Sequence, residues 1–195
     1  MGNPIIVGIS GASGVIYGVE LLRVLEDLGQ ETHLILSTAG EMNLNIETDY
    51  SPEQTKRLAS VVHRFDNLAA PVASGSFQTR GMIVAPCSIK SLSAIANSYN
   101  DNLLVRAADV TLKERRPLVL MVRETPLHKG HLDLMSRCAD LGAVILPPVP
   151  AFYQKPENIK DLIHHSIGKS LDMLGIVHQL YRRWGEQRSD TFNSH

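Results

Sequence analysis

The sequence lacks the features that mark several large protein classes. Among its 195 residues only Cys87 and Cys138 are cysteines, so a disulfide scaffold is excluded and both thiols are expected to be buried and unreactive. Nineteen Lys and Arg nearly balance twenty Asp and Glu, which gives no electrostatic case for nucleic acid or an anionic membrane as a partner. No apolar run approaches a membrane span, and no basic, then hydrophobic secretion signal opens the chain. We therefore expect a cytoplasmic protein.

Two common nucleotide-binding signatures are also missing. After the apolar run 5–7, glycines stand at positions 8, 11 and 14, which is neither the dinucleotide fingerprint Gly-x-Gly-x-x-Gly nor a loop ending in Gly-Lys-Ser/Thr. The next expected strand ends in Ser37 instead of an acidic residue that would hold a ribose, which argues against NAD. No Asp-rich motif for magnesium pyrophosphate is present. A mononucleotide or a flavin remains compatible.

The residues around the glycine turn favour the binding of an anion. An apolar run, a tight turn and a helical pattern from residue 15 follow one another. This order directs backbone N–H groups and the positive end of a helix dipole at one point, which suits a phosphate. Ser10 and Ser13 add hydroxyl donors. The alternative is a tight turn without a ligand.

Five apolar strand patterns alternate with helical patterns along the chain. The strands are expected near 5–7, 32–37, 81–86, 117–122 and 143–146, and the last helix at about 157–181. The alternation predicts a doubly wound α/β fold, with a parallel sheet and helices on both faces, in one domain over 1–185 followed by a polar tail, 186–195. Two strand orders, 3-2-1-4-5 and 2-1-3-4-5, are compatible with the sequence.

Ligands of parallel α/β sheets bind at the carboxyl ends of the strands. Ser88 is the expected N-cap of the helix after the third strand, so that junction and the glycine turn face one site. Arg123 ends the almost wholly apolar fourth strand at the same edge, where a guanidinium suits bidentate phosphate recognition. Arg106, Lys113 and Lys169 are further basic candidates, with solvated helix faces as the alternative.

Other polar residues are candidates for chemistry. Glu47 and Glu124 are the candidates for proton transfer in a dry pocket. Tyr153 follows a stiff, proline-rich segment and is either a phosphate ligand or a core residue. His128 and His131 lie one helical turn apart, a spacing that permits metal ligation, but no motif supplies a third ligand. We expect no metal.

Several motifs resemble one family, in the same order along the chain. They are Gly11-Ala12-Ser13-Gly14, Glu47-Thr48, Ser74-Gly75-Ser76-Phe77, Pro86-Cys87-Ser88-Ile89-Lys90, Arg106-Ala107-Ala108-Asp109-Val110, Leu112-Lys113-Glu114-Arg115-Arg116, Arg123-Glu124-Thr125-Pro126-Leu127 and Pro147-Pro148-Val149-Pro150-Ala151-Phe152-Tyr153. The chain resembles the UbiX/Pad-type flavin prenyltransferases from about residue 4 to residue 184. The resemblance implies a flavodoxin-like or Rossmann-like subunit of a homododecamer, with sites at subunit interfaces.

The resemblance also implies a reaction. A dimethylallyl group passes from dimethylallyl monophosphate to N5 and C6 of reduced FMN, without metal. The product, prenylated FMN, goes to a UbiD-type decarboxylase, often in ubiquinone synthesis or aromatic-acid metabolism. Two alternatives are an enzyme like the flavin-dependent cysteine decarboxylases, whose Pro-x-Met-Asn block is absent here, and an FMN-binding subunit without a reaction of its own.

The roles of individual residues follow from the same resemblance. The flavin is held by Gly11, Ala12, Ser13, Ser37, Ser88, Ile89, Lys90, Ser91 and Arg123. The prenyl phosphate is bound by Tyr153 and Lys169, with Arg106 and Lys113 completing a basic pocket. Catalysis involves Ser13, Glu47, Glu124, Lys113 and Trp184, where the two glutamates move protons and Trp184 closes the pocket.

Overall fold

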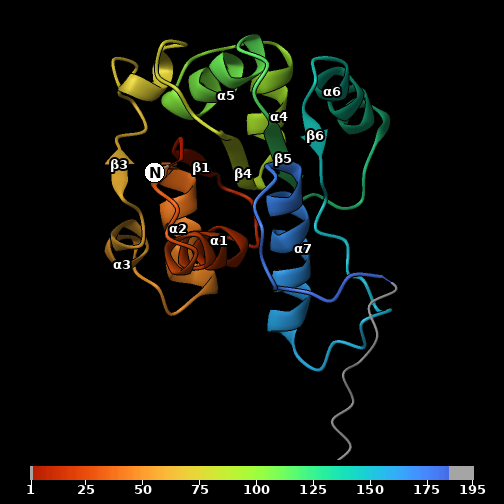
Figure 1. Ribbon diagram of the computed structural model, residues 1–195. Helices are drawn as coiled ribbons and strands as arrows, with labels where there is room; N and C mark the ends of the chain where they lie inside the picture. The colour runs from red at the N-terminus through yellow and green to blue at the C-terminus, as the bar shows by residue number, and fades with distance from the viewer. Residues whose placement is uncertain (1, 185–195) are drawn as a thin grey trace, which may run out of the picture.

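The structure, a computed structural model, describes residues 2–184 and forms a parallel α/β fold (Figure 1). Within these residues six strands build one sheet in the order β3-β2-β1-β4-β5-β6, and every neighbouring pair is parallel. The strands are β1 (Ile5–Ile9), β2 (Thr32–Leu36), β3 (Val61–His63), β4 (Gly81–Cys87), β5 (Leu118–Val122) and β6 (Val144–Ile145). The predicted fold class is confirmed. The predicted tail 186–195 lies outside the described residues.

The strand order reverses direction at β1, between β2 and β4. The five strands that the sequence predicts stand in the order β2-β1-β4-β5-β6, which is the second of the two orders left open. The edge strand β3 is an addition to the prediction. Its Val61 and Val62 are exposed and it pairs with β2 over only three residues, so it lacks the buried apolar pattern that identifies the other strands.

Seven α-helices within residues 2–184 cover the two faces of the sheet (Figure 1). They are α1 (Ile16–Asp27), α2 (Thr38–Glu47), α3 (Pro52–Arg57), α4 (Ile89–Ala96), α5 (Leu103–Lys113), α6 (Lys129–Asp140) and α7 (Ile159–Met173), and a 3-10 turn, η1, spans Pro71–Ala73. Buried side chains of α1 and α7 form a core on one face, and those of α4, α5 and α6 form a core on the other. No helix of this described part is long and apolar enough to cross a membrane.

The central strands are buried on both faces because neighbouring side chains point to opposite cores. In β4, Ile83 packs with the α1 and α7 side, whereas Met82 and Val84 pack with the α4 and α5 side. Both cysteines are fully buried and unpaired. Burial raises the pKa of both thiols, that of Cys138 to about 11. The prediction that both cysteines are buried is confirmed.

The last helix is shorter than predicted. It ends at Met173, and Gly175 follows in the left-handed conformation, with φ +63°. The apolar pattern continues beyond this point, because Ile176 is buried against the same core. A glycine in this conformation ends a helix, so the chain turns back along α7 instead of continuing to residue 181.

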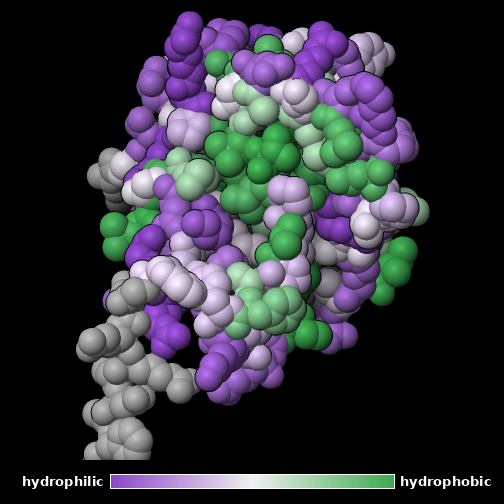
Figure 2. Space-filling view, turned by 90° about the vertical axis from the view of Figure 1, so that its right-hand side faces the viewer, coloured by the Kyte–Doolittle hydropathy of each residue, from purple (hydrophilic) through white to green (hydrophobic). Residues whose placement is uncertain are grey.

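One face of the molecule is unusually apolar. Figure 2 shows a broad hydrophobic area on the side where α6, β6 and the loop after β6 lie in Figure 1. Exposed apolar side chains in these segments or directly beside α6 include Leu127, Leu132, Leu141, Val149 and Phe152. An area of this kind marks a surface that another molecule covers.

Packing explains the spacing of the glycine turn. A Cβ atom on Gly11 would lie 2.3 Å from the Cβ of Ala39 at the start of α2, so only glycine fits there. Gly14 has a φ of +91°, which L side chains rarely adopt. The turn therefore requires these glycines whether or not an anion binds.

The close approach of Gly11 to Ala39 predicts that a destabilising substitution at one position is compensated by a substitution at the other. Gly11→Ala is expected to lower the free energy of unfolding by about 1–3 kcal/mol through overpacking. Adding Ala39→Gly removes the facing methyl group and is expected to restore stability to within about 1 kcal/mol, the cost of a helical glycine. Urea unfolding of the single and double variants measures both changes. A double variant no more stable than Gly11→Ala would contradict the packing explanation.

Candidate active site

A pocket of about 390 Å³ opens at the carboxyl edge of the sheet, beside the switch in strand order. Its lining comprises Gly11, Ser37, Thr38, Ala39, Met42, Phe65, Ser88, Lys90, Ser91, Ala94, Asp101, Asn102 and Val105. Ser37 and Ser88 are the N-caps of α2 and α4, and their hydroxyls accept hydrogen bonds from Gly40 N (3.0 Å) and Ser91 N (3.2 Å). Two helix N-termini therefore border the pocket, which favours an anionic ligand.

Ser10 joins the ends of β1 and β4 beneath this pocket. Its buried hydroxyl donates to Pro86 O (2.9 Å) and accepts from Ser88 N (2.8 Å). The interpretation of Ser10 as a donor to a ligand is therefore wrong. Its hydroxyl is used within the protein, and it fixes the start of α4 relative to the glycine turn.

The glycine turn holds a carboxylate of the protein itself. Glu47, the last residue of α2, accepts hydrogen bonds from Gly14 N (2.7 Å) and Val15 N (3.3 Å) at the start of α1. The two N–H groups that the sequence suggested for a phosphate thus face a side-chain anion. The same contacts fix the position of Glu47 at the edge of the site.

Arg123 reaches the glycine turn from the end of β5. Its Nε donates to Ser13 O over 3.1 Å, although 110 positions separate the two residues. The sequence predicts that the carboxyl ends of the first and fourth strands lie at the same edge of the sheet, and this contact confirms it. The charge of Arg123 also acts on Tyr17, whose pKa is raised by burial and partly lowered again by a hydrogen bond with Ser166 and by Arg123.

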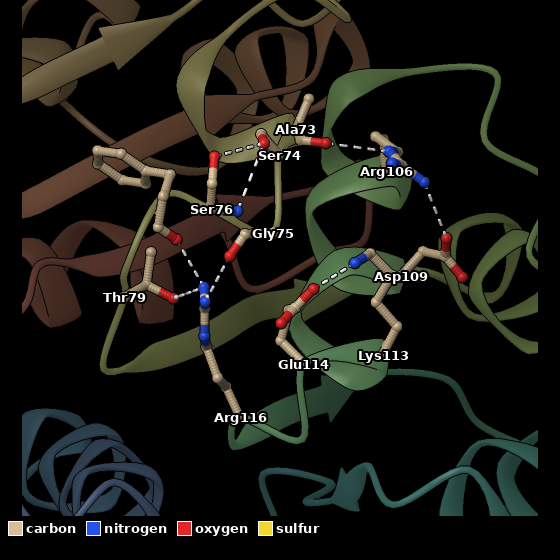
Figure 3. A network of polar contacts seen from close by, with 11 residues as sticks. Ala73, Ser74, Gly75, Ser76, Thr79, Arg106, Asp109, Lys113, Glu114 and Arg116 are labelled. Atoms are coloured by element: carbon tan, nitrogen blue, oxygen red, sulfur yellow. Dashed lines mark hydrogen bonds and ion pairs between the residues drawn. The ribbon is translucent and has the colours of Figure 1, made fainter.

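Arg106 and Lys113 stand on α5 and face the loop around Gly75 (Figure 3). The Nε of Arg106 donates to Ala73 O and its Nη1 to Asp109 Oδ2, both over 3.2 Å. Lys113 donates to Glu114, and both side chains lie against Gly75. Arg106 follows Val105, which lines the pocket, so α5 joins the pocket to this basic group.

Arg116 holds the same loop from the other side (Figure 3). Its guanidinium donates to Phe77 O (2.6 Å), Gly75 O (2.7 Å) and Thr79 Oγ1 (3.4 Å). With most of its N–H groups used on the loop, Arg116 is a structural residue. It gives the Ser74–Phe77 motif a fixed shape beside Arg106 and Lys113.

The remaining basic and aromatic candidates gather elsewhere, around α7. The hydroxyl of Tyr153 lies 3.4 Å from His165 Nε2, and its ring packs edge-on against Trp184 at 5.4 Å between centroids. The ammonium of Lys169 lies 6.0 Å from the ring centre of Tyr181. Burial, followed by the charge of Lys169, lowers the pKa of His165. Tyr153, Lys169 and Trp184 thus belong to one cluster.

Asp172 fastens the segment after α7 back onto that helix. Its carboxylate accepts from Tyr181 and from Arg183 (2.8 Å), and it lies 3.2 Å from His178 Nε2. Burial alone raises the pKa of Asp172, but the hydrogen bonds from Arg183 and Tyr181, and the charges of Arg183 and His178, together hold it below its ordinary value of 3.8. Sequence reasoning missed this residue, because its partners His178, Tyr181 and Arg183 all lie beyond the observed end of α7 at Met173, where the chain was predicted to continue as helix to about residue 181.

Asp172 gives a prediction for pH dependence. Because its pKa is lowered in the folded chain, its stabilising effect is complete above pH 3.8 and is lost as the pH falls through the folded pKa. Asp172→Asn is expected to lower the free energy of unfolding by about 1.5–3 kcal/mol at pH 7. Urea unfolding at pH 7 and pH 3 should show a smaller difference from the wild type at the lower pH. An equal difference at both values would contradict the assignment.

Known proteins match nearly the whole chain. The family model described as Flavoprotein matches residues 1–178. Flavin prenyltransferase UbiX of Escherichia coli strain K12 is 56% identical over 183 residues, which cover 92% of this chain and 97% of that protein. The chain belongs to the UbiX flavin prenyltransferase family.

Two solved structures of UbiX proteins match the fold closely. AnUbiX (PadA1), in complex with FMN and dimethylallyl pyrophosphate, has a TM-score of 0.93 and 47% identity, covering 95% of this chain and 98% of its own. A dodecameric FMN-dependent UbiX-like decarboxylase from Escherichia coli O157:H7 has a TM-score of 0.91 and 44% identity, covering 94% and 100%. In contrast, the FMN-dependent cysteine decarboxylase TvaF is only 13% identical, so its TM-score of 0.65 shows the fold alone.

Within one UbiX-family subunit the predicted site residues form three groups. Gly11, Ser37, Ser88, Lys90 and Ser91 line the pocket, and Ala12, Ser13, Ile89, Glu47 and Arg123 lie in or at the turns beside it. Arg106 and Lys113 form the second group on α5, and Tyr153, Lys169 and Trp184 form the third around α7. No hydrogen bond or ring contact among residues 2–184 joins the second group to the third.

Two predictions stand apart from these groups. Glu124 is exposed and its carboxylate accepts a hydrogen bond from the N–H of Thr125 (3.0 Å), next to it in the chain. His128 and His131 stack at 3.6 Å between ring centroids, but within residues 2–184 no three His, Cys, Asp or Glu side chains are placed to hold a metal ion.

Two residues of the pocket were not predicted from the sequence. They are Phe65 and Met42, which form apolar walls of the pocket.

Proposed function

We propose that this protein is a flavin prenyltransferase that transfers a dimethylallyl group from dimethylallyl monophosphate to N5 and C6 of reduced FMN. The observation that carries the proposal is the position of α5, whose first turn lines the pocket while Arg106 and Lys113 extend from the same helix. One element thus places phosphate-binding cations beside a flavin-sized cavity. The UbiX relatives, one of them solved with FMN and dimethylallyl pyrophosphate, support this function.

The pocket suits FMN on its own chemistry. Its volume of about 390 Å³ lies in the range of small-ligand sites. The N-termini of α2 and α4, with Ser37, Ser88 and Ser91, offer donors to the phosphate and hydroxyl groups of FMN. Met42, Phe65 and Val105 offer apolar surface to the ring system. When bound, reduced FMN supplies the nucleophilic positions that accept the prenyl group.

Basic side chains supply the positive charge that a metal ion supplies in other enzymes. Breaking the C–O bond of dimethylallyl monophosphate leaves negative charge on the departing phosphate, which Arg106, Lys113 and Lys169 neutralise and Tyr153 binds through its hydroxyl. The aromatic side chains of Tyr153 and Trp184 exclude water from the allylic group. Arg123 orients the flavin from the glycine turn, and Glu47, Glu124 and Ser13 handle protons at the reacting edge.

Release of inorganic phosphate tests this function. Purified protein with reduced FMN and dimethylallyl monophosphate is expected to release phosphate steadily until one substrate is exhausted. Oxidised FMN in place of the reduced form should give no release, and EDTA should not slow the reaction. No release above a protein-free control would refute the proposal.

We also propose that the protein assembles into a homododecamer in which the active site is shared between subunits. Two observations support this: the second and third groups lie apart within one chain, and apolar side chains are exposed over α6 and the loop after β6 (Figure 2). The dodecameric relative shows that the fold permits such an assembly. Light scattering should give twelve times the mass of 21.5 kDa, and a monomer with full activity would exclude a shared site.

The product is proposed to serve a UbiD-type decarboxylase in the cytoplasm. Prenylated FMN is of use only to an enzyme that binds it, and the two free thiols of this chain suit a reducing compartment. Adding the reaction mixture to such a decarboxylase in its cofactor-free form should restore decarboxylation. Restoration by FMN alone would remove this protein from that role.

A further inference from the structure

Arg106 is held in one orientation from two sides (Figure 3). Its Nε donates to Ala73 O at the end of η1, and its Nη1 donates to Asp109 Oδ2, one helical turn further along α5. A guanidinium is planar, so fixing Nε and one Nη also fixes the direction of the other Nη. That third nitrogen, Nη2, makes no hydrogen bond to another described residue, and it is the one available to a ligand.

Asp109 makes a second contact that leads to the pocket. The same Oδ2 accepts a hydrogen bond from Asn100 Nδ2 over 3.0 Å. Asn100 precedes Asp101 and Asn102, both of which line the pocket. The other amide atom of Asn100, Oδ1, is buried without a partner among residues 2–184, so Asp109 is what sets the orientation of this amide. One carboxylate therefore ties Arg106 to the wall of the pocket.

We propose that Asp109 is a positioning residue for the prenyl-phosphate site. It holds the Arg106 guanidinium so that Nη2 faces the phosphate. Through its hydrogen bond with Asn100, it also fixes the position of that guanidinium relative to the wall of the pocket. The inference rests on the proposed function, because it takes Arg106 as a ligand of the prenyl phosphate. The side chain of Asp109 is 22% exposed, so solvent only partly screens the ion pair.

Two simpler roles for Asp109 make different predictions. If Asp109 only reduced the positive charge of the site, its removal would tighten phosphate binding. If it only stabilised α5, its removal would lower the melting temperature and leave ligand affinity unchanged. A positioning role instead predicts weaker binding of the prenyl phosphate with FMN affinity preserved.

The experiment compares Asp109→Asn with Asp133→Asn by titration calorimetry of dimethylallyl monophosphate and of FMN. Asp133 pairs with Lys129 at a similar helical spacing on α6, but both side chains are exposed, so Asp133→Asn is the matched control. We expect Asp109→Asn to raise the Kd of dimethylallyl monophosphate about tenfold, and Asp133→Asn to leave it unchanged. A Kd for Asp109→Asn equal to or below that of the wild type would overturn the inference.

A double-mutant cycle with Arg106→Ala shows whether Asp109 acts through Arg106. In the Arg106→Ala background, Asp109→Asn is expected to have no further effect on the Kd, and a further tenfold loss would overturn the inference. If Asp109→Asn does not fold, Asp109→Glu keeps the charge but moves it; positioning predicts weaker binding, and a wild-type Kd would contradict it. A wild type that neither binds nor consumes the prenyl phosphate refutes the proposed function itself, whereas an active wild type with an indifferent Asp109 refutes only this inference.

Discussion

Glu47→Gln is expected to slow prenyl transfer by about 10²–10⁴-fold while changing FMN affinity little, the range for loss of a general acid or base. Glu47 stands at the carboxyl edge of the sheet, where Gly14 N and Val15 N donate to its carboxylate. Glutamine keeps an oxygen for these donors but cannot move a proton at the same atom. The measurement is the single-turnover rate with saturating reduced FMN.

The structural role of Glu47 is separable from its proton transfer. Glu47→Ala leaves the first turn of α1 without its anion and is expected to cost about 1 kcal/mol of stability, whereas Glu47→Gln should cost less. Glu53→Gln, on the exposed face of α3, is the control and should change neither rate nor stability. Wild-type rates in Glu47→Gln would show that Glu47 serves only as the cap of α1.

Replacing Arg106 or Lys113 by alanine is expected to slow prenyl transfer by about 10²–10³-fold, the effect of removing one group that stabilises developing charge. The Kd of FMN should change by less than about threefold, because neither side chain lines the pocket. Rates and flavin titrations on the same preparations measure the two effects. Lys129→Ala is the matched control, because Lys129 is an exposed lysine of α6 that pairs with Asp133.

The comparison of the two losses decides the role of these cations. If transfer and FMN binding fall by the same factor, Arg106 and Lys113 belong to the flavin site and not to the prenyl-phosphate site. If EDTA slows the wild type as strongly as either substitution does, a metal ion supplies the charge instead. Both outcomes contradict the proposal that side chains alone neutralise the leaving phosphate.

The fold was predictable because its strands are continuous apolar runs with clear boundaries. Ser88 caps the helix after the third predicted strand, as the sequence predicts. Strand β3 was not predicted because it is three residues long and mostly exposed. The end of α7 was predicted too late because Gly175 ends the helix while the apolar pattern continues beyond it. Local patterns report burial, and both errors occur where burial and secondary structure disagree.

The sequence predicted which residues form the site better than it predicted the contacts between them. Arg123 was expected at the ligand edge, and it reaches the glycine turn. The contact of Glu47 with that turn spans 33 positions and has no local signal in the sequence. Asp109 and Asp172 were missed for the same reason, since each acts by holding other side chains. The glycine turn, predicted as part of the ligand site, also packs against Ala39 and binds the carboxylate of Glu47, and the sequence did not predict either contact.

The mass of the flavin tests the account most directly. The purified protein is incubated without oxygen, with reduced FMN, dimethylallyl monophosphate and EDTA, and the flavin is then extracted for mass spectrometry. The account predicts a flavin heavier than reduced FMN by one C5H8 unit, formed together with inorganic phosphate. A flavin of unchanged mass, recovered from protein that is folded and binds FMN, would contradict it.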